Sequence, residues 1–316
     1  MKNIIVTEKL TKKYGNISVV DNVNLHVPKG KIYGLLGRNG AGKTSTMKMM
    51  LGLSTPSFGT VKIYGKDCRK YSGEIYGKIG SIIETPGFYA NLTGYENLRI
   101  IAKLRGNITK KQIMNALKLV GLHNEKKKVF SNYSLGMKQR LGIAASIMHE
   151  PELLILDEPI NGLDPIGISE MRSLLSDLSR NKGITILISS HVLSEIEQIA
   201  DVIGVMHKGR VLEEVYMKEL HRRKRNFTEF TVSNVEKAEI LLRNSSFFDK
   251  DTNLTLEVVK EYNSSKGRLR IFGCDFSIPH INKILVESGI SVFGINTDEE
   301  NLEDYFTNII GGGGIA

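Results

Sequence analysis

Apolar residues in the first two-thirds of the chain form short runs, separated by stretches in which they recur every third or fourth position. The runs have the length of a strand and occupy residues 32–36, 153–156 and 184–188. Such largely apolar runs are typical of parallel strands that are covered on both faces. The stretch from Lys43 to Leu53 has a helical period, as does most of 92–122, with interruptions at Gly106 and Gly121. Strands that alternate with helices predict an α/β core.

The pattern changes after Glu219. Shorter segments there predict two helices and four strands in the order β-α-β-β-α-β, which is typical of a small ferredoxin-like domain. They are strand 227–232, helix 235–243, a hairpin around 263–267, helix 278–288 and strand 290–295. A last helix is expected at 301–309. We therefore expect a first domain at 1–218, an accessory domain at 226–310 and a flexible tail at 311–316.

Charge follows the same division. Residues 1–210 hold 30 basic and 17 acidic side chains, a net charge of +13, whereas residues 211–316 carry −4. A basic surface of this size favours an anionic partner, either nucleic acid or a membrane surface. The composition, with 41% hydrophobic and 24% charged residues, is that of an ordinary globular protein.

Features of other protein classes are missing from the sequence. No apolar run approaches the roughly 18–20 residues that would cross a bilayer. Glu8 interrupts the N-terminus before an apolar signal-peptide core can form. The two cysteines, Cys68 and Cys274, make no metal-binding spacing, so a reduced cytoplasmic setting is the simplest interpretation.

A glycine-rich segment follows the strand at 32–36 and precedes a predicted helix. It fits the pattern GxxxxGK[ST] in full, with the residues Gly37, Arg38, Asn39, Gly40, Ala41, Gly42, Lys43 and Thr44. Glycines let successive backbone N–H groups point at phosphate oxygens, and the helix N-terminus adds partial positive charge. Lys43 is expected to bridge the β- and γ-phosphates, and the Thr44 hydroxyl to bind Mg²⁺. The segment predicts binding of a nucleoside triphosphate.

Two acidic residues follow the apolar strand at 153–156. Asp157 stands at the end of this strand, where it can hold Mg²⁺, and Glu158 beside it can polarise an attacking water as a general base. This pair favours hydrolysis of the triphosphate over passive binding.

Together these motifs resemble the ATP-binding subunit of an ABC transporter over about residues 3–215. The resemblance implies a P-loop NTPase of ABC type with a helical subdomain. Tyr14 resembles the aromatic residue that stacks on adenine, although a half-buried strand residue is the alternative. The stretch 133–140 resembles the signature loop, whose usual sequence is Leu-Ser-Gly-Gly-Gln. Ser134 and Gly136 are kept, while Tyr133, Leu135 and Met137 depart from the pattern. The resemblance implies that this loop contacts the γ-phosphate bound to a second ATPase subunit.

Three further residues take roles from the same resemblance. Asp164 resembles the residue that links the two nucleotide sites of the dimer, with a helix N-cap as the alternative. His191 resembles the switch histidine that senses the γ-phosphate. Glu84 stands where most family members have a glutamine that touches Mg²⁺ or the attacking water. Glutamate at this position is associated with bacitracin-resistance and lantibiotic-immunity transporters, and the segment 301–306 resembles an ending common in drug and antibiotic exporters.

The resemblance thus implies an ATPase subunit that works as a dimer at the cytoplasmic face of the membrane, bound to separate membrane subunits. ATP and Mg²⁺ are the expected cofactors, and a peptide antibiotic is the expected cargo. The alternatives are a general multidrug exporter and a soluble ATPase associated with nucleic acid. The second is disfavoured because the chain has one phosphate loop and no sustained heptads. We therefore attribute the +13 charge to an anionic membrane surface, with no nucleic-acid partner.

Overall fold

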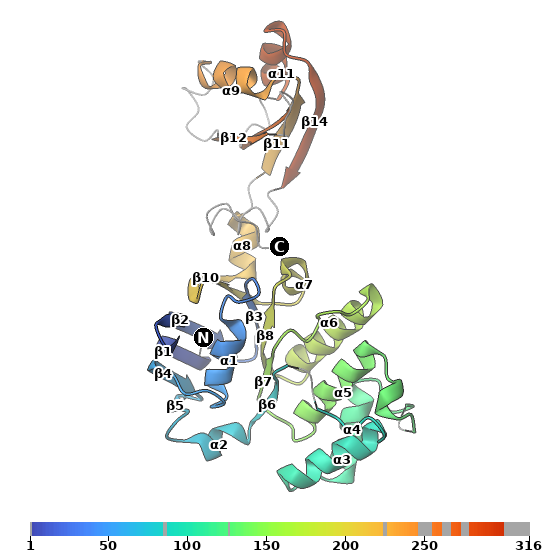
Figure 1. Cartoon of the computed structure of the whole chain (residues 1–316). Coiled ribbons are helices and arrows are strands. Elements are labelled where there is room, and N and C mark those ends of the chain that lie inside the picture. The colour runs from blue at the N-terminus through green and yellow to red at the C-terminus, as the bar shows by residue number, and fades with distance from the viewer. Residues whose placement is uncertain are drawn as a thin grey trace. The chain divides into compact units, whose positions relative to one another are not determined.

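The structure is a computed structural model of the chain (Figure 1). It describes residues 2–84, 87–125, 127–223, 226–245, 255–260, 267–272 and 278–299. The chain divides into two compact units between Glu219 and Leu220. No helix within the described ranges is both long enough and apolar enough to span a bilayer.

A six-stranded sheet forms the centre of the first unit, in the order β10-β9-β3-β8-β7-β6. Its strands are β3 (Ile32–Leu36), β6 (Ile79–Ile82), β7 (Leu153–Leu156), β8 (Thr185–Ser190), β9 (Val202–His207) and β10 (Arg210–Tyr216). All neighbours are parallel except β9 and β10. The prediction of an α/β core is therefore confirmed. Because parallel strands end at one edge, the loops after β3, β6, β7 and β8 meet there.

An antiparallel sheet in the order β2-β1-β4-β5 belongs to the same unit. Its strands are β1 (Asn3–Tyr14), β2 (Ile17–Pro28), β4 (Phe58–Ile63) and β5 (Lys66–Asp67). Within the long β1–β2 hairpin, apolar residues cluster at Ile4–Val6 and alternate with polar ones at Val23–Val27. The remaining strand residues include exposed polar side chains, so apolar runs alone do not reveal them.

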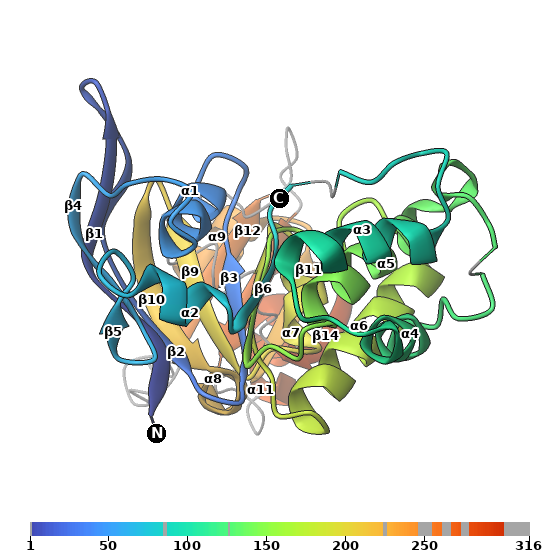
Figure 2. The same ribbon diagram turned by 90° about the horizontal axis from the view of Figure 1, so that it is seen from below.

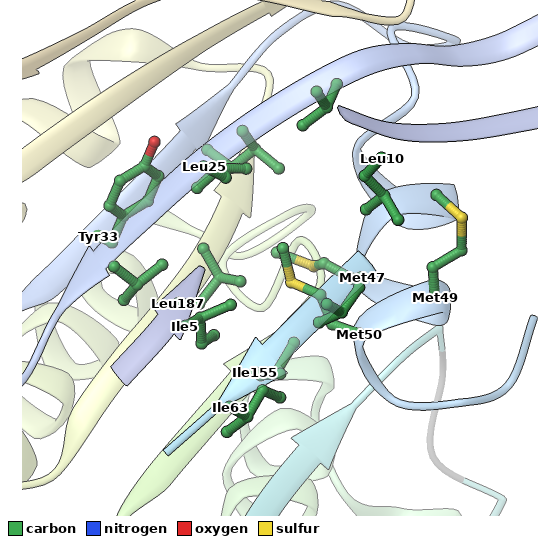
Figure 3. Packing of buried hydrophobic residues seen from close by; sticks show 14 of the residues in the cluster. Ile5, Leu10, Leu25, Tyr33, Met47, Met49, Met50, Ile63, Ile155 and Leu187 are labelled. Atoms are coloured by element: carbon green, nitrogen blue, oxygen red, sulfur yellow. The ribbon is translucent and has the colours of Figure 1, made fainter. Parts of the chain in front are cut away.

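Helix α1 (Lys43–Met50) lies between the two sheets of this unit (Figures 1 and 2). Its Met47 and Met50 side chains are fully buried. They belong to a core cluster that also holds Ile5 of the antiparallel sheet and Ile155 of the central sheet (Figure 3). Burial against two sheets fixes the helix, and with it the loop that immediately precedes it.

Four helices lie on the other side of the central sheet (Figure 2). They are α3 (Gly94–Arg105), α4 (Lys110–Leu119), α5 (Leu135–Ile147) and α6 (Pro165–Arg180). Thr93 and Thr109 begin α3 and α4 with capping boxes, in which threonine and the residue three positions later cap each other. The short elements are α2 (Ser72–Tyr76), a 3₁₀ turn at Phe130–Asn132, α7 (Leu193–Glu197) and α8 (Met217–Arg223).

The second unit has the element order predicted from the sequence. It contains β11 (Asn226–Val232), α9 (Val235–Arg243), β12 (Thr255–Lys260), β13 (Gly267–Phe272), α11 (Ile278–Glu287) and β14 (Val292–Glu299). The strands form an antiparallel sheet in the order β12-β13-β11-β14. Phe230 of β11, Leu242 of α9 and Leu285 of α11 share one fully buried core. The predicted helix 301–309, the tail 311–316, the resemblance at 301–306 and Cys274 lie outside the described residues.

Candidate nucleotide-binding site

The glycine-rich loop runs from the end of β3 to the start of α1. Gly40 and Gly42 have φ angles of 81° and 106°, in the left-handed region that favours glycine. A Cβ atom on Gly37 would lie 2.3 Å from the backbone oxygen of Met206. The loop conformation and its close packing on β9 therefore depend on glycine at these positions.

The N-terminus of α1 offers a site for an anion. Gly42 is its N-cap, and within the described residues no side chain caps the helix and no acidic residue stands in its first turn. The N–H groups of a first helical turn need an external acceptor and carry partial positive charge. A phosphate group meets both requirements, so the loop fits the nucleotide that its sequence predicts.

Lys43 is the cation of this loop and is only 5% exposed. Its ammonium group donates to the backbone oxygens of Gly37 and Arg38. It also lies 3.1 Å from Oε1 of Glu158. The lysine is thus held at the loop by three oxygen atoms, beside the glutamate that the sequence proposed as general base.

Asp157 follows β7 and is 9% exposed. One of its carboxylate oxygens accepts a hydrogen bond from Thr44 Oγ1 at 2.7 Å, and the other accepts from Ser189 Oγ at 2.6 Å. The threonine of the phosphate loop and the aspartate of the neighbouring strand therefore present oxygen atoms to the same place. A hydroxyl and a carboxylate are suitable ligands for Mg²⁺, which takes most of its other ligands from phosphates and water.

Glu158 is held on both of its carboxylate oxygens. Oε1 faces Lys43, and Oε2 lies 2.8 Å from Nδ1 of His191, which follows β8. The φ angle of Glu158 is 47°, which is unusual for a residue other than glycine. Such a strained backbone is kept only where the surrounding structure holds it in place, and this is common at functional sites. The carboxylate is therefore positioned, as a general base must be.

Sequence reasoning assigned no role to Ser189, which is fully buried at the carboxyl end of β8. Its hydroxyl donates to Asp157 and accepts from the backbone N–H of Glu158 at 2.9 Å. One hydroxyl therefore orients both acidic residues. The available signal was the pair of serines, Ser189 and Ser190, that ends a largely apolar strand.

We expect Ser189→Ala to lower the rate of ATP hydrolysis by about tenfold and stability by about 1–3 kcal/mol. The substitution leaves one carboxylate oxygen of the nearly buried Asp157 without its hydrogen-bond donor. An unsatisfied acceptor has lost its contact with water without gaining a protein partner, and this destabilises the folded state. Steady-state hydrolysis and denaturant unfolding measure the two effects. Ser179→Ala, which removes another buried serine hydroxyl on α6, is the matched control. Equal hydrolysis in the two variants would contradict the assignment.

Glu84 lies in the loop after β6 and has a φ angle of 64°. Its carboxylate is 2.7 Å from the ammonium of Lys48 on α1. The hydrogen bond and the charge of Lys48 hold the pKa of Glu84 below its usual range, and Glu84 likewise raises the pKa of Lys48. The pair therefore stays ionised at neutral pH. Sequence reasoning named Glu84 but not its partner.

Tyr14 is the last residue of β1 and is 58% exposed. It is thus a strand residue, as the alternative interpretation had it, but it is exposed rather than half-buried. The ammonium of Lys12 lies 4.9 Å from the ring centroid and donates to the backbone oxygen of Thr55 at 2.8 Å. An exposed ring beside a fixed cation offers a surface on which a base can stack.

Ser134 and Gly136 stand at the start of α5. Ser134 is the N-cap and accepts a hydrogen bond from the backbone N–H of Met137 at 3.3 Å. Of the three departures from the signature pattern, Tyr133 and Met137 are buried, whereas Leu135 is 47% exposed. Two of the departures are therefore packing residues, and Leu135 is the one that changes the exposed surface.

Asp164 is the N-cap of α6 and accepts a hydrogen bond from the backbone N–H of Gly167 at 2.9 Å. The capping interpretation of Asp164 is therefore confirmed.

The site divides into two sets of contacts. Lys43, Thr44, Asp157, Glu158 and His191 form one connected set at the carboxyl edge of the central sheet, whereas Ser134 and Asp164 each cap a helix.

Comparisons with known proteins show the family to which the chain belongs. The family model described as "ABC transporter" matches residues 20–161. The chain is 60% identical to the bacitracin transport ATP-binding protein BcrA of Enterococcus faecalis, over 100% of this chain and 99% of that protein. It is 46% identical to the lantibiotic transport ATP-binding protein SrtF of Streptococcus pyogenes, over 66% of this chain and 88% of that protein.

A solved structure shares the fold over 71% of this chain. It is cbiO1 of Clostridium perfringens, described as part of the ABC transporter complex cbiONQ. The TM-score is 0.64 at 29% identity, covering 71% of this chain and 92% of that one. The chain therefore belongs to the ABC transporter family and is one of its ATP-binding proteins, an ATPase.

Proposed function

We propose that this ATPase powers an exporter that protects the cell against a peptide antibiotic of the bacitracin or lantibiotic type. The observation that carries the proposal is the 60% identity with a bacitracin transport protein over the whole chain, second unit included. The 46% identity with a lantibiotic transport protein supports the same class of cargo. Glutamate at position 84, in place of the usual glutamine, agrees with this class, as the family resemblance implies.

Nucleotide binding rests on the phosphate loop. The N–H groups of residues 38–44 and the Lys43 ammonium would bind the phosphates, while Tyr14 would stack on adenine. Thr44 and Asp157 would hold Mg²⁺, which neutralises charge on the phosphates when bound.

Hydrolysis rests on the carboxylates. Glu158 would accept a proton from the attacking water, while Lys43 and His191 fix its two oxygens. Glu84 would touch the same water from the loop after β6. The chain contributes positioning and charge neutralisation, with no covalent intermediate.

The assembly we propose is a dimer of ATPase subunits bound to separate membrane subunits. Residues 1–218 form the ATPase domain, and residues 226–310 an accessory domain. Ser134 and Gly136 of one subunit contact the nucleotide of the other, and Asp164 lies between the two sites. The +13 charge of residues 1–210 would be attracted to an anionic membrane surface, with each nearby basic residue contributing up to about 1 kcal/mol.

A strain in which this gene is deleted should become sensitive to bacitracin or to a lantibiotic, and not to unrelated drugs. Minimal inhibitory concentrations across such a panel measure the effect. The wild-type chain should restore resistance, and the Glu158→Gln chain should not. Unchanged sensitivity to the peptides would overturn the proposal, and equal sensitisation to unrelated drugs would indicate a general multidrug exporter.

A further inference from the structure

Lys48 lies on the same face of α1 as the phosphate-loop residue Thr44. It stands four residues after Thr44, so the two side chains lie on one face of the helix, a turn apart. Thr44 contacts Asp157, and Lys48 contacts Glu84. A single helical face therefore connects the loops that follow β6 and β7.

The edge of the sheet carries an excess of acids at this point. Strands β6 and β7 are parallel neighbours with Ile82 opposite Leu156, so Glu84, Asp157 and Glu158 all follow adjacent strand ends. Lys43 pairs with Glu158, and Lys48 pairs with Glu84. The charge of Asp157 also contributes to the raised pKa of Lys48. A glutamine at position 84 would be uncharged and would need no cation beside it. A glutamate there is repelled by bound phosphates, and a neighbouring cation offsets this repulsion.

We propose that Lys48 is the positioning residue for Glu84, offsetting its charge and holding its carboxylate against the phosphate-loop helix. The inference rests on the proposed place of Glu84 beside the bound nucleotide. The Glu84 and Lys48 side chains are 68% and 36% exposed, so the pair adds little to stability. The ion pair therefore positions the Glu84 carboxylate and offsets its charge, and it contributes little to the stability of the fold.

A double-mutant cycle on the full-length chain tests this role. Binding of a fluorescent ATP analogue with Mg²⁺ is measured for wild type, Lys48→Met, Glu84→Gln and the double variant. We expect Lys48→Met to weaken binding about fivefold in the wild-type background and less than about twofold in the Glu84→Gln background. The coupling should shrink in about 0.5 M salt, because charges at exposed sites are screened. Lys48→Arg should retain most of the affinity.

Lys62 offers a matched control, because its ammonium lies 2.8 Å from the carboxylate of Glu8 on the antiparallel sheet. Lys62→Met should leave nucleotide affinity unchanged. An equal effect of Lys48→Met in both backgrounds, or a coupling insensitive to salt, would overturn the inference. Because the cycle measures nucleotide binding alone, its outcome is independent of which molecule the transporter carries.

Discussion

Replacing Glu158 with glutamine should lower the rate of ATP hydrolysis by about a hundredfold or more and leave ATP affinity within about twofold. A general base contributes about 10²–10⁴ to a rate, and an amide cannot accept the proton of the attacking water. Glutamine has the same shape, so its amide oxygen can still accept from Lys43 and its NH₂ group can still contact His191. Binding and folding should therefore persist.

Single-turnover hydrolysis and equilibrium ATP binding, measured on one preparation, separate the two effects. Glu152→Gln is the matched control, because Glu152 immediately precedes β7 and pairs with Lys29 and Lys78. That variant should hydrolyse ATP at the wild-type rate. Normal turnover in Glu158→Gln would remove Glu158 from the role of base, and the remaining candidates would be the carboxylate of Glu84 or a water held by Asp157.

The parts of the site that the sequence predicted are those fixed by local chain geometry. A glycine-rich loop between a strand and a helix has few alternatives, because the positive φ angles at Gly40 and Gly42 strongly favour glycine. Two acids after a buried strand must emerge at its carboxyl edge. Helix caps such as Asp164 are equally local, since the acceptor and the N–H group are three residues apart.

The parts that the sequence did not predict depend on partners distant in the chain. Ser189 acts on residues more than thirty positions away, and Lys48 meets Glu84 thirty-six positions away. Neither contact follows from periodicity or from a motif. The left-handed backbone of Glu84 and Glu158 was also unforeseen, because that conformation is uncommon outside glycine and is imposed by tertiary packing.

Replacing Lys43 with alanine should weaken ATP binding by about tenfold to a hundredfold. A hydrogen bond to a charged group contributes about 1.5–3 kcal/mol when its partner is removed. The ammonium of Lys43 is nearly buried and held by the loop, so little ordering is needed when a phosphate binds. Its loss also leaves Oε1 of Glu158 without its cation, and the unpaired carboxylate repels an anionic ligand.

Affinity must be the measurement for this variant, because the disturbed Glu158 would lower hydrolysis even if binding were intact. Lys31→Ala is the matched control. Lys31 immediately precedes β3, and its ammonium lies 3.1 Å from Asp201, the same separation as between Lys43 and Glu158. Both variants remove a lysine from an ion pair beside one strand, but only Lys43 stands at its carboxyl end. Equal affinities would show that the phosphate loop does not bind nucleotide through Lys43, whereas weak binding by Lys43→Ala alone locates the triphosphate at that end of the sheet.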